Sequence, residues 1–363
     1  MDMWSKQADG SLAAPPRLVP ITDVEAELAR LWSNVETVQT GIAAGRAALL
    51  NLVILCPTRS AADEARQTAS LLSGSHPSRT FVVVTDHEQA GTSLQAWVSA
   101  RCTLQPGGAR QVCCEEVLIA ASGGALEFAA QAISPLFLPD LPAFLWLTSF
   151  RPEDFGLAKR FAAVCDKLIW DTDELPSPVE MLPDAARLRA EMADTAVGDL
   201  AWVRTSPLRR RVAEEISKTA QSLGRVDRVR VSCAPDTFGG ALLIAGWLAS
   251  ALGWDARIGR RSSRELIFTV QRAGAGADLA PAEIAVVCDP DAPISVTLSG
   301  ATDLAVAAPP PAQSACGPGT AGGSPSGELA SLLCLALESH AREAALDRAL
   351  AQAAAMLSPL HAA

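Results

Sequence analysis

The sequence has no excess of basic residues, and this absence excludes a first broad class of function. Its 30 lysines and arginines are outnumbered by 40 aspartates and glutamates, which gives a formal net charge of −10 and a pI near 5.0. Binding to a nucleic-acid backbone depends on clustered Lys and Arg side chains that displace counterions. We therefore exclude a general nucleic-acid-binding protein.

Long apolar segments of the kind that enter membranes are also missing. The amino terminus, MDMWSKQADG, turns polar where a secretory signal would carry an apolar run. Residues 128–150 are poor in charge but are broken by three prolines, and residues 237–254 only reach the lower limit of span length and contain several glycines. We expect both stretches in a buried core, no membrane partner and a cytoplasmic location.

Cysteine pairs with metal-binding or redox spacing are absent. The nine cysteines include no CxxC motif, so a structural zinc site or a thioredoxin-type site has no support, and without an export signal we expect reduced thiols. Only Cys113 and Cys114 are adjacent, and with Glu115 and Glu116 they should alternate across a strand. Packing as small hydrophobes is the favoured interpretation of these two thiols, and a redox role is the alternative.

The motifs of common catalytic sites are missing as well. The sequence contains no HExxH, GxSxG or GxxxxGK[ST], and its four histidines form no metal-spaced pair. His76, which precedes Pro77, could serve as a general base, but a loop residue at the entry to a strand is the simpler interpretation. We predict a protein that is not an enzyme and has no cofactor and no metal.

A glycine pair between a predicted strand and a predicted helix is the best candidate for a phosphate site. Free backbone amides and the helix dipole attract anions at such a turn, here Gly123 and Gly124. The GxGxxG fingerprint of dinucleotide binding is absent, and two glycines after a strand more often only make the turn. Ligand binding at this turn is therefore the less favoured alternative.

The chain has ample apolar material, 49% of 363 residues, which suits two domains. Strands and helices alternate in its first half, and the nearly continuous apolar run at residues 47–56 is typical of a strand buried in a parallel sheet. The fold class is therefore α/β, with an N-terminal mostly parallel sheet covered by helices and a smaller C-terminal mixed α+β domain. The predicted boundaries are a flexible N-terminus (1–20), an N-terminal α/β domain (21–198), a junction helix segment (199–224), a C-terminal α+β domain (225–308), a Pro/Gly/Ser linker (309–327) and a C-terminal helix (328–363).

The segment DLAWVRTSPLRRRVAEEI, residues 199–216, combines a tryptophan with four arginines in an acidic chain. The arginines either form a solvated helix face, paired with Glu214 and Glu215, or they dock an acidic partner or a phosphate. Trp202 should be buried. The candidates for partner docking are Arg204, Arg209, Arg210 and Arg211, and the candidates for a structural junction are Asp199, Trp202, Trp247 and Trp254.

Five motifs in a fixed order resemble one protein family. They are HPSR (76–79), VCCEE (112–116), DLPAFLW (140–146), DLAWVRTSPLR (199–209) and GWLASALGW (246–254). Together they resemble the OpcA family, the glucose-6-phosphate dehydrogenase assembly proteins of cyanobacteria and actinobacteria, from residue 47 to about residue 299. Ala201 stands where the family usually has Asn, and Leu208 stands where a second Trp commonly precedes the final Arg. These departures concern details of the junction.

The resemblance implies a non-enzymatic accessory protein that binds glucose-6-phosphate dehydrogenase and promotes its active oligomer in the oxidative pentose phosphate pathway. Such an allosteric activator acts through its preference for one state of the enzyme. In cyanobacteria the partnership is also linked to redox control, to which the cysteine placement adds no independent support. The alternative is a sugar-phosphate-binding or nucleotide-binding protein that uses the Gly123–Gly124 turn and the arginines from Arg204 to Arg211.

Overall fold

The computed structural model of the protein divides into two compact units, each built from separate parts of the sequence. Unit 1 comprises Met1–Trp170, Asp194–Ala196 and Gln313–Ala341, and unit 2 comprises Asp171–Ala193, Val197–Ala312 and Arg342–Ala363. The structure describes residues 5–6, 12–35, 43–87, 91–104, 110–192, 194–218, 226–262, 264–272, 282–300, 304–308 and 325–358. Most of the predicted linker, residues 309–324, lies outside the described residues.

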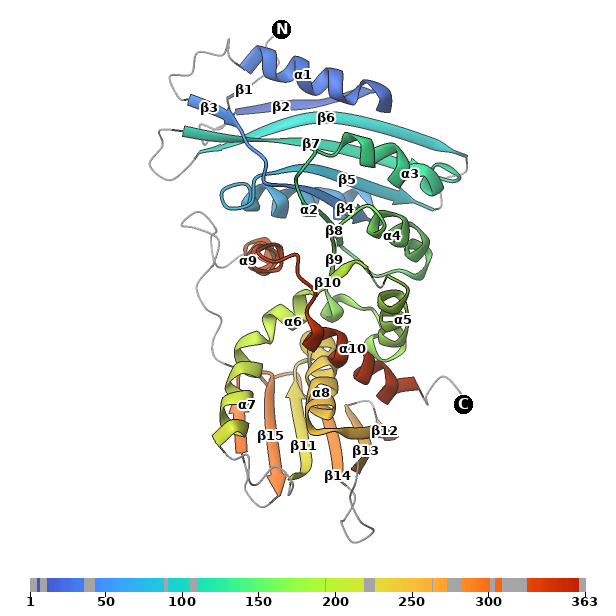
Figure 1. Ribbon diagram of the computed structural model, residues 1–363, viewed down its shortest axis with the longest axis vertical. Coiled ribbons are helices and arrows are strands. Elements are labelled where there is room, and N and C mark those ends of the chain that lie inside the picture. Colours follow the sequence, from blue (N-terminus) through green and yellow to red (C-terminus); the bar gives the residue numbers. More distant parts are fainter. Residues whose placement is uncertain are drawn as a thin grey trace. The chain divides into compact units, whose positions relative to one another are not determined.

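The first sheet confirms the predicted mostly parallel α/β fold (Figure 1). Ten strands of the described residues follow the order β1-β2-β6-β7-β5-β4-β8-β9-β10, with β3 paired to β7. Strands β7, β5, β4, β8 and β9 run parallel, whereas β2 and β6 join the sheet antiparallel. The bounds are β1 Ser5–Lys6, β2 Leu12–Val19, β3 Ala43–Arg46, β4 Leu50–Cys56, β5 Ser78–Asp86, β6 Ser93–Leu104, β7 Arg110–Ser122, β8 Ala143–Leu147, β9 Lys167–Trp170 and β10 Ala196–Asp199.

The central parallel strands have sequences that suit burial on both faces, as strands covered by crossover helices require. All seven residues of β4 and all five residues of β8 are buried, as their apolar composition requires. Thr58 begins α2 by accepting a hydrogen bond from the backbone of Ala61, and buried Asn51 fixes the proline-rich loop by bonding both the amide and the carbonyl of Leu138. Helices of unit 1 are α1 Val24–Val35, α2 Arg59–Leu72, α3 Ala125–Ile133, α4 Phe155–Ala162 and α9 Pro325–Leu337.

The amino terminus differs from the prediction of a flexible segment at residues 1–20. Leu12–Val19 form β2, which pairs with β6 through a register shift between Ala14 and Arg17. Pro15 and Pro16 lie at that shift, where the missing backbone donors interrupt the ladder at little cost. In the sequence alone, the two prolines suggest a loop. In the structure, pairing with β6 gives residues 12–19 a defined strand conformation.

Unit 2 contains a smaller mixed sheet, as predicted, in the order β12-β13-β14-β11-β15-β16. In β11, buried Val229 and Val231 alternate with exposed Arg228 and Arg230, so one face is covered and the other meets solvent. The strands are β11 Val226–Cys233, β12 Trp254–Arg261, β13 Glu265–Arg272, β14 Ala282–Cys288, β15 Ser295–Gly300 and β16 Leu304–Ala307. The helices are α5 Pro178–Glu191, α6 Leu200–Arg204, α7 Ser206–Lys218, α8 Phe238–Leu252 and α10 Ala344–Leu357.

Helix α8 is apolar around nearly its whole circumference because it is covered on two sides. It contacts strands β11, β12 and β14 of the sheet on one side and α10 on another (Figure 1). A Cβ on Gly246 would lie 2.3 Å from the carbonyl oxygen of Ala349 in α10, so only glycine allows this approach. The charge-poor segment at residues 237–254 is thus a buried core helix.

The carboxyl-terminal segment contains the predicted helix but is divided in two. A break at residues 338–343 separates α9, which belongs to unit 1, from α10, which belongs to unit 2. Buried Lys167 donates to the carbonyls of Ala336 and Ser339 and so satisfies acceptors at the end of α9. In the part of the chain that the structure describes, no helix is long and apolar enough to cross a membrane.

Candidate functional site

Asp199 organises the start of the arginine-rich segment in unit 2. Its side chain is 1% exposed, accepts hydrogen bonds from the backbone of Ala201 at 2.9 Å and Trp202 at 3.3 Å, and also binds the hydroxyl of Thr172. These bonds cap α6 in the way that an N-cap aspartate does. Asp199, the first residue of the motif DLAWVRTSPLR, therefore caps the first helix of that motif.

Trp202 is buried, as predicted, and it holds Arg209. The indole Nε1 donates to Glu343 over 2.5 Å, and the guanidinium of Arg209 lies 3.2 Å from the ring centroid. Arg209 also donates to the backbone carbonyl of Trp202 at 2.7 Å. Burial lowers the pKa of Arg209 to about 10, opposed by the carboxylates of Glu343 and Asp199. Arg209 therefore acts inside the unit.

Arg204 is held inside the unit as well. Its guanidinium pairs with Asp171 at 2.8 Å and with Asp173 in η4 (Thr172–Glu174). Burial raises the pKa of Asp173 to about 7, against the opposing effects of Arg204 and of a hydrogen bond from the backbone of Gly240. Gly240 lies in the first turn of α8, so the cluster joins η4, α6 and α8. Arg204 thus has two carboxylate partners inside unit 2.

Arg210 and Arg211 are the two docking candidates that remain exposed. Both lie on α7, and Arg211 donates to the carbonyl of Ala307 at 3.0 Å. Among the described residues, Arg210 has no carboxylate partner. Glu215 pairs with Lys218 over 2.7 Å. The sequence had placed all four arginines in one set, and the structure separates them into an internal pair and an exposed pair.

The other junction candidates, Trp247 and Trp254, lie on α8 and at the start of β12. Trp254 is 7% exposed, and its carbonyl accepts a hydrogen bond from Gln352 of α10 at 3.3 Å. Trp247 is half-buried. With Asp199 and Trp202 they belong to unit 2, and the contacts named for them are made inside this unit.

Unit 1 contains a buried charge cluster that the sequence analysis missed. Arg79, from the HPSR motif, is 2% exposed and pairs with Glu115, which is 3% exposed, over 2.6 Å. Arg79 also donates to the carbonyl of Leu136 at 2.6 Å and to Glu25, while Glu115 accepts from Arg46 and Trp32. The sequence did show Glu115 on a strand whose side chains alternate between two faces. Only the strand register reveals that Arg79 is its partner.

The adjacent cysteines separate onto the two faces of β7. Cys113 forms a disulfide with Cys102, which stands directly opposite it on β6. Strand pairing brings these two residues directly opposite each other and within bonding reach, although they are separated by 11 positions in the sequence. The expectation of reduced thiols is therefore wrong for these two residues, and also for Cys334, which is disulfide-bonded. Cys114 is a free cysteine, and burial raises the pKa of its thiol to about 11. The neighbours Cys113 and Cys114 therefore do not act as a pair.

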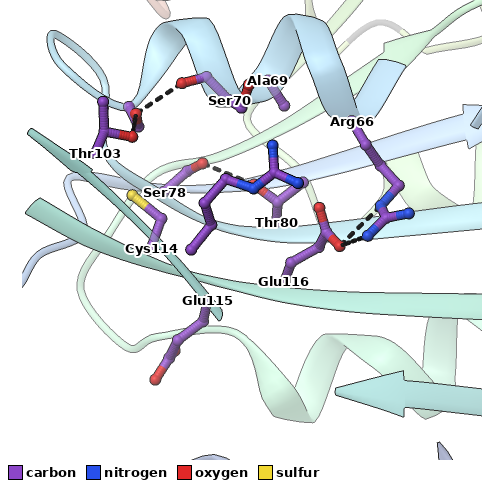
Figure 2. A pocket seen from close by; sticks show the side chains of 11 residues that line it. Arg66, Ala69, Ser70, Ser78, Thr80, Thr103, Cys114, Glu115 and Glu116 are labelled. Atoms are coloured by element: carbon purple, nitrogen blue, oxygen red, sulfur yellow. Dashed lines mark hydrogen bonds and ion pairs between the residues drawn. The ribbon is translucent and has the colours of Figure 1, made fainter. Parts of the chain in front are cut away.

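A polar pocket lies between α2 and the sheet, and we call it the α2 pocket (Figure 2). Figure 2 shows Arg66 and Glu116 directed toward each other, with Ser78 and Thr80 beside them, while Glu115 points to the opposite side of the strand. Arg66 binds Glu116 through Nε at 2.8 Å. The lining is formed by Arg66, Ala69, Ser70, Ser73, Ser78, Thr80, Arg101, Thr103, Cys114, Glu115 and Glu116.

The Gly123–Gly124 turn is packed against the chain rather than open. Gly123 has a φ of +53°, and a Cβ there would lie 2.6 Å from the carbonyl oxygen of Gly91. The amide of Gly124 donates to the hydroxyl of Thr92 at 3.2 Å. The positive φ and the close approach of the Gly91 backbone account for Gly123, whereas Gly124 lies against the side chain of Thr92. His76 contacts Ser75 at 3.2 Å and Cys334 at 3.4 Å, which places it beside α9.

The strand order β7-β5-β4-β8-β9-β10 is that of doubly wound folds that bind dinucleotides. The residues of the first strand-to-helix turn decide whether a dinucleotide could bind here. Such a cofactor requires glycines in the first strand-to-helix turn, where its pyrophosphate approaches the backbone. Here Cys56, Pro57 and Thr58 form that turn, Pro57 has no amide hydrogen, and the Thr58 hydroxyl already caps α2. These residues do not fit a dinucleotide.

Polar residues at the carboxyl ends of β5 and β8 bind one another. His87 contacts Asp154 at 2.7 Å, and Arg151 pairs with Asp154 at 2.8 Å and donates to Thr85 at 3.0 Å. Their hydrogen bonds fix the loops at this edge of the sheet. Across the described part of the chain, no group of three His, Cys, Asp or Glu side chains could hold a metal ion.

The fold and these clusters define a two-unit α/β protein, with a doubly wound sheet in one unit and a one-sided mixed sheet in the other. Two family models match the chain. The model for the N-terminal domain of the glucose-6-phosphate dehydrogenase subunit matches residues 69–187, and the model for the C-terminal domain of the same protein matches residues 195–354. The chain belongs to the OpcA family of glucose-6-phosphate dehydrogenase assembly domains.

Curated relatives bear the same family name. Two proteins named "Putative OxPP cycle protein OpcA" are similar: that of Synechocystis sp. is 28% identical over 51% of this chain and 39% of its own length, and that of Nostoc punctiforme is 33% identical over 44% and 35%. The matched region is thus well under half of each relative. Among solved structures, apo scyllo-inositol dehydrogenase from Lactobacillus casei has a TM-score of 0.45 at 10% identity, covering 86% of this chain and 96% of that chain.

Proposed function

We propose that this protein is a non-enzymatic accessory protein that binds glucose-6-phosphate dehydrogenase and promotes its active oligomeric assembly. The observation that carries the proposal is the match of two successive domain models of this family to residues 69–187 and 195–354. The relatives' names place those proteins in the OxPP cycle. On this proposal the chain acts in the cytoplasm, without a nucleic-acid or membrane partner.

The exposed arginines of α7 are the docking residues in this proposal. Arg204 and Arg209 are held by partners inside unit 2, whereas Arg210 is exposed and has no carboxylate partner in the described part of the chain. A guanidinium in this state can form a charge-assisted hydrogen bond with a partner's carboxylate without first breaking an internal one. Arg211 keeps one bond, to a backbone carbonyl.

The direct experiment titrates the full chain into glucose-6-phosphate dehydrogenase from the same organism. Light scattering measures the mass of the complex, and enzyme activity is followed in parallel. We expect a mass increase beyond simple addition and a rise in activity, because the accessory protein prefers the assembled state. Absence of a complex at micromolar concentrations would exclude the proposal.

A matched pair of variants tests the docking face separately. Arg210→Glu should weaken the complex by about tenfold or more, because it replaces an attractive charge with a repulsive one. Arg230→Glu is the control, since Arg230 is also an exposed arginine of unit 2 whose contact is a hydrogen bond to Ser232. Equal effects of both variants would contradict docking through α7 while leaving the assembly function standing.

The alternative of a sugar-phosphate site at Gly123–Gly124 and the arginine segment gains no support from the geometry. The amide of Gly124 is bonded to Thr92, and Arg204 and Arg209 have internal partners.

A further inference from the structure

The face of the first sheet beneath α2 is polar at the position where a helix normally covers apolar side chains. At the amino ends of β5 and β7 and the adjoining part of β6, side chains with oxygen, nitrogen or sulfur atoms face the α2 pocket. Some of these polar groups bind one another: Arg66 of α2 binds Glu116, and Ser99 donates a hydrogen bond to the same carboxylate at 3.0 Å. The remaining polar groups of the pocket are not explained by that pair.

One positive charge of the pocket has no carboxylate partner among the residues that the structure describes. Arg66 binds Glu116 and also the exposed Asp63, and Glu115 is turned to the opposite face of the sheet (Figure 2), where it binds Arg79. This leaves Arg101, which lines the pocket from β6 and has no carboxylate partner among the residues that the structure describes. Arg101 therefore offers the pocket an accessible guanidinium that is free to bind an anion, in a chain whose net charge is −10.

The hydroxyl groups leave donor capacity next to this guanidinium. Ser78 and Thr80 bind each other at 2.8 Å, and because only one of the two hydrogens lies in that bond, the other can bind a ligand. Cys114 stands opposite Arg101 in the register. Burial raises the pKa of its thiol to about 11, so the thiol is neutral and does not repel an anion.

We propose that the α2 pocket binds the phosphate group of a small phosphate monoester, with Arg101 as the principal binding residue. A guanidinium fork matches the oxygens of a phosphate, and hydroxyl donors complete its hydrogen bonds. The cavity itself measures about 30 Å³ and is open to solvent. The phosphate group therefore binds at the mouth, beside Arg101, and the remainder of the molecule extends into solvent.

Calorimetric titration of the full chain tests this site, with inorganic phosphate and glycerol 3-phosphate as the two probes and sodium chloride at matched ionic strength as the blank. Tighter binding of the monoester identifies a phosphorylated metabolite as the ligand class, and equal binding shows that free phosphate satisfies the pocket and overturns the monoester assignment. Absence of saturable heat with both probes overturns the site altogether.

Two variants test whether the phosphate monoester binds in the α2 pocket. Arg101→Gln should weaken binding by about tenfold or more, because the charge and the fork geometry are both lost. Arg230→Gln removes an exposed arginine of unit 2 and should leave affinity unchanged. Since Arg101 is exposed, the variant should keep the wild-type melting temperature without ligand, and equal affinity in both variants would overturn the assignment.

Cysteine alkylation gives a second readout that does not require a variant. Cys114 and Cys288 are both free and half-buried, and only Cys114 lines the pocket. Saturating glycerol 3-phosphate should slow modification of Cys114 by iodoacetamide and leave Cys288 unaffected, as followed by peptide mass spectrometry. An unchanged rate at Cys114 under conditions where calorimetry shows saturation would place the ligand elsewhere and overturn the proposal.

Discussion

Nε of Arg79 donates to Oε2 of Glu115 over 2.6 Å, and both side chains are almost completely buried. The two residues are 36 positions apart in the sequence and stand opposite each other on β5 and β7. They belong to two of the five motifs by which the family resemblance was recognised. The HPSR motif supplies the arginine and the VCCEE motif supplies the glutamate of one internal ion pair. Both motifs therefore have a structural role inside unit 1.

The Arg79–Glu115 pair gives the first prediction. Arg79→Met should destabilise the protein by about 3–5 kcal/mol, because it leaves the Glu115 carboxylate buried with fewer partners. The double variant with Glu115→Leu should recover part of this loss, since no buried charge is then left unpaired and the other partners, Arg46 and Glu25, are exposed to water. Urea unfolding of the wild type, both single variants and the double variant measures the coupling. Additive losses would contradict a direct pair.

Asp173 predicts a pH dependence of stability. Its folded pKa of about 7 exceeds the unfolded value, for which the reference is 3.8. The folded state then holds more protons between these values, so the contribution of Asp173 is fully present below about pH 4 and is lost as the pH rises through about 7. Asp173→Asn should remove this slope, and urea unfolding from pH 5 to pH 8 checks it. Parallel curves for the two proteins would contradict the raised pKa.

The indole hydrogen bond of Trp202 can be tested with a conservative change. Trp202→Phe keeps an aromatic ring near Arg209 but removes the donor to Glu343, which should cost about 1–3 kcal/mol, chiefly from lost packing, because water can solvate the exposed Glu343 carboxylate. Glu343→Gln, which keeps an acceptor, is the milder control. Thermal unfolding of both variants provides the comparison, and an equal loss in the two would argue that the bond contributes little beyond the ring.

The contact between α8 and α10 depends on the absence of a side chain. Gly246→Ala should destabilise unit 2 by about 1–3 kcal/mol, because the new methyl group overlaps the backbone of Ala349 and Ala353. Gly74→Ala is the matched control, since a Cβ there meets nothing within 4 Å, and its effect should be close to zero. Calorimetry measures the melting temperature of both variants, and equal values for the two would contradict the steric role of Gly246.

The sequence alone predicted the α/β class, the buried strand near residue 50 and the burial of Trp202, because apolar periodicity is a local property. It could not separate Arg204 and Arg209 from Arg210, since all three carry the same charge and the residues that bind two of them lie elsewhere in the chain or depend on packing. The partners that distinguish them, Asp171 and the ring of Trp202, are fixed by the packing of η4, α6 and α7. The exposed pair was therefore found only in three dimensions.

Pairings across strands were likewise decided by tertiary structure. The sequence determined that Cys113, Cys114, Glu115 and Glu116 alternate between two faces, because side chains on a strand do so with a period of two. It did not determine which residue stands opposite each of them. The register of β6, β7 and β5 placed Cys102 against Cys113 and Arg79 against Glu115, and it left Arg101 facing the α2 pocket. Strand register depends on the whole sheet, and a local pattern does not contain it.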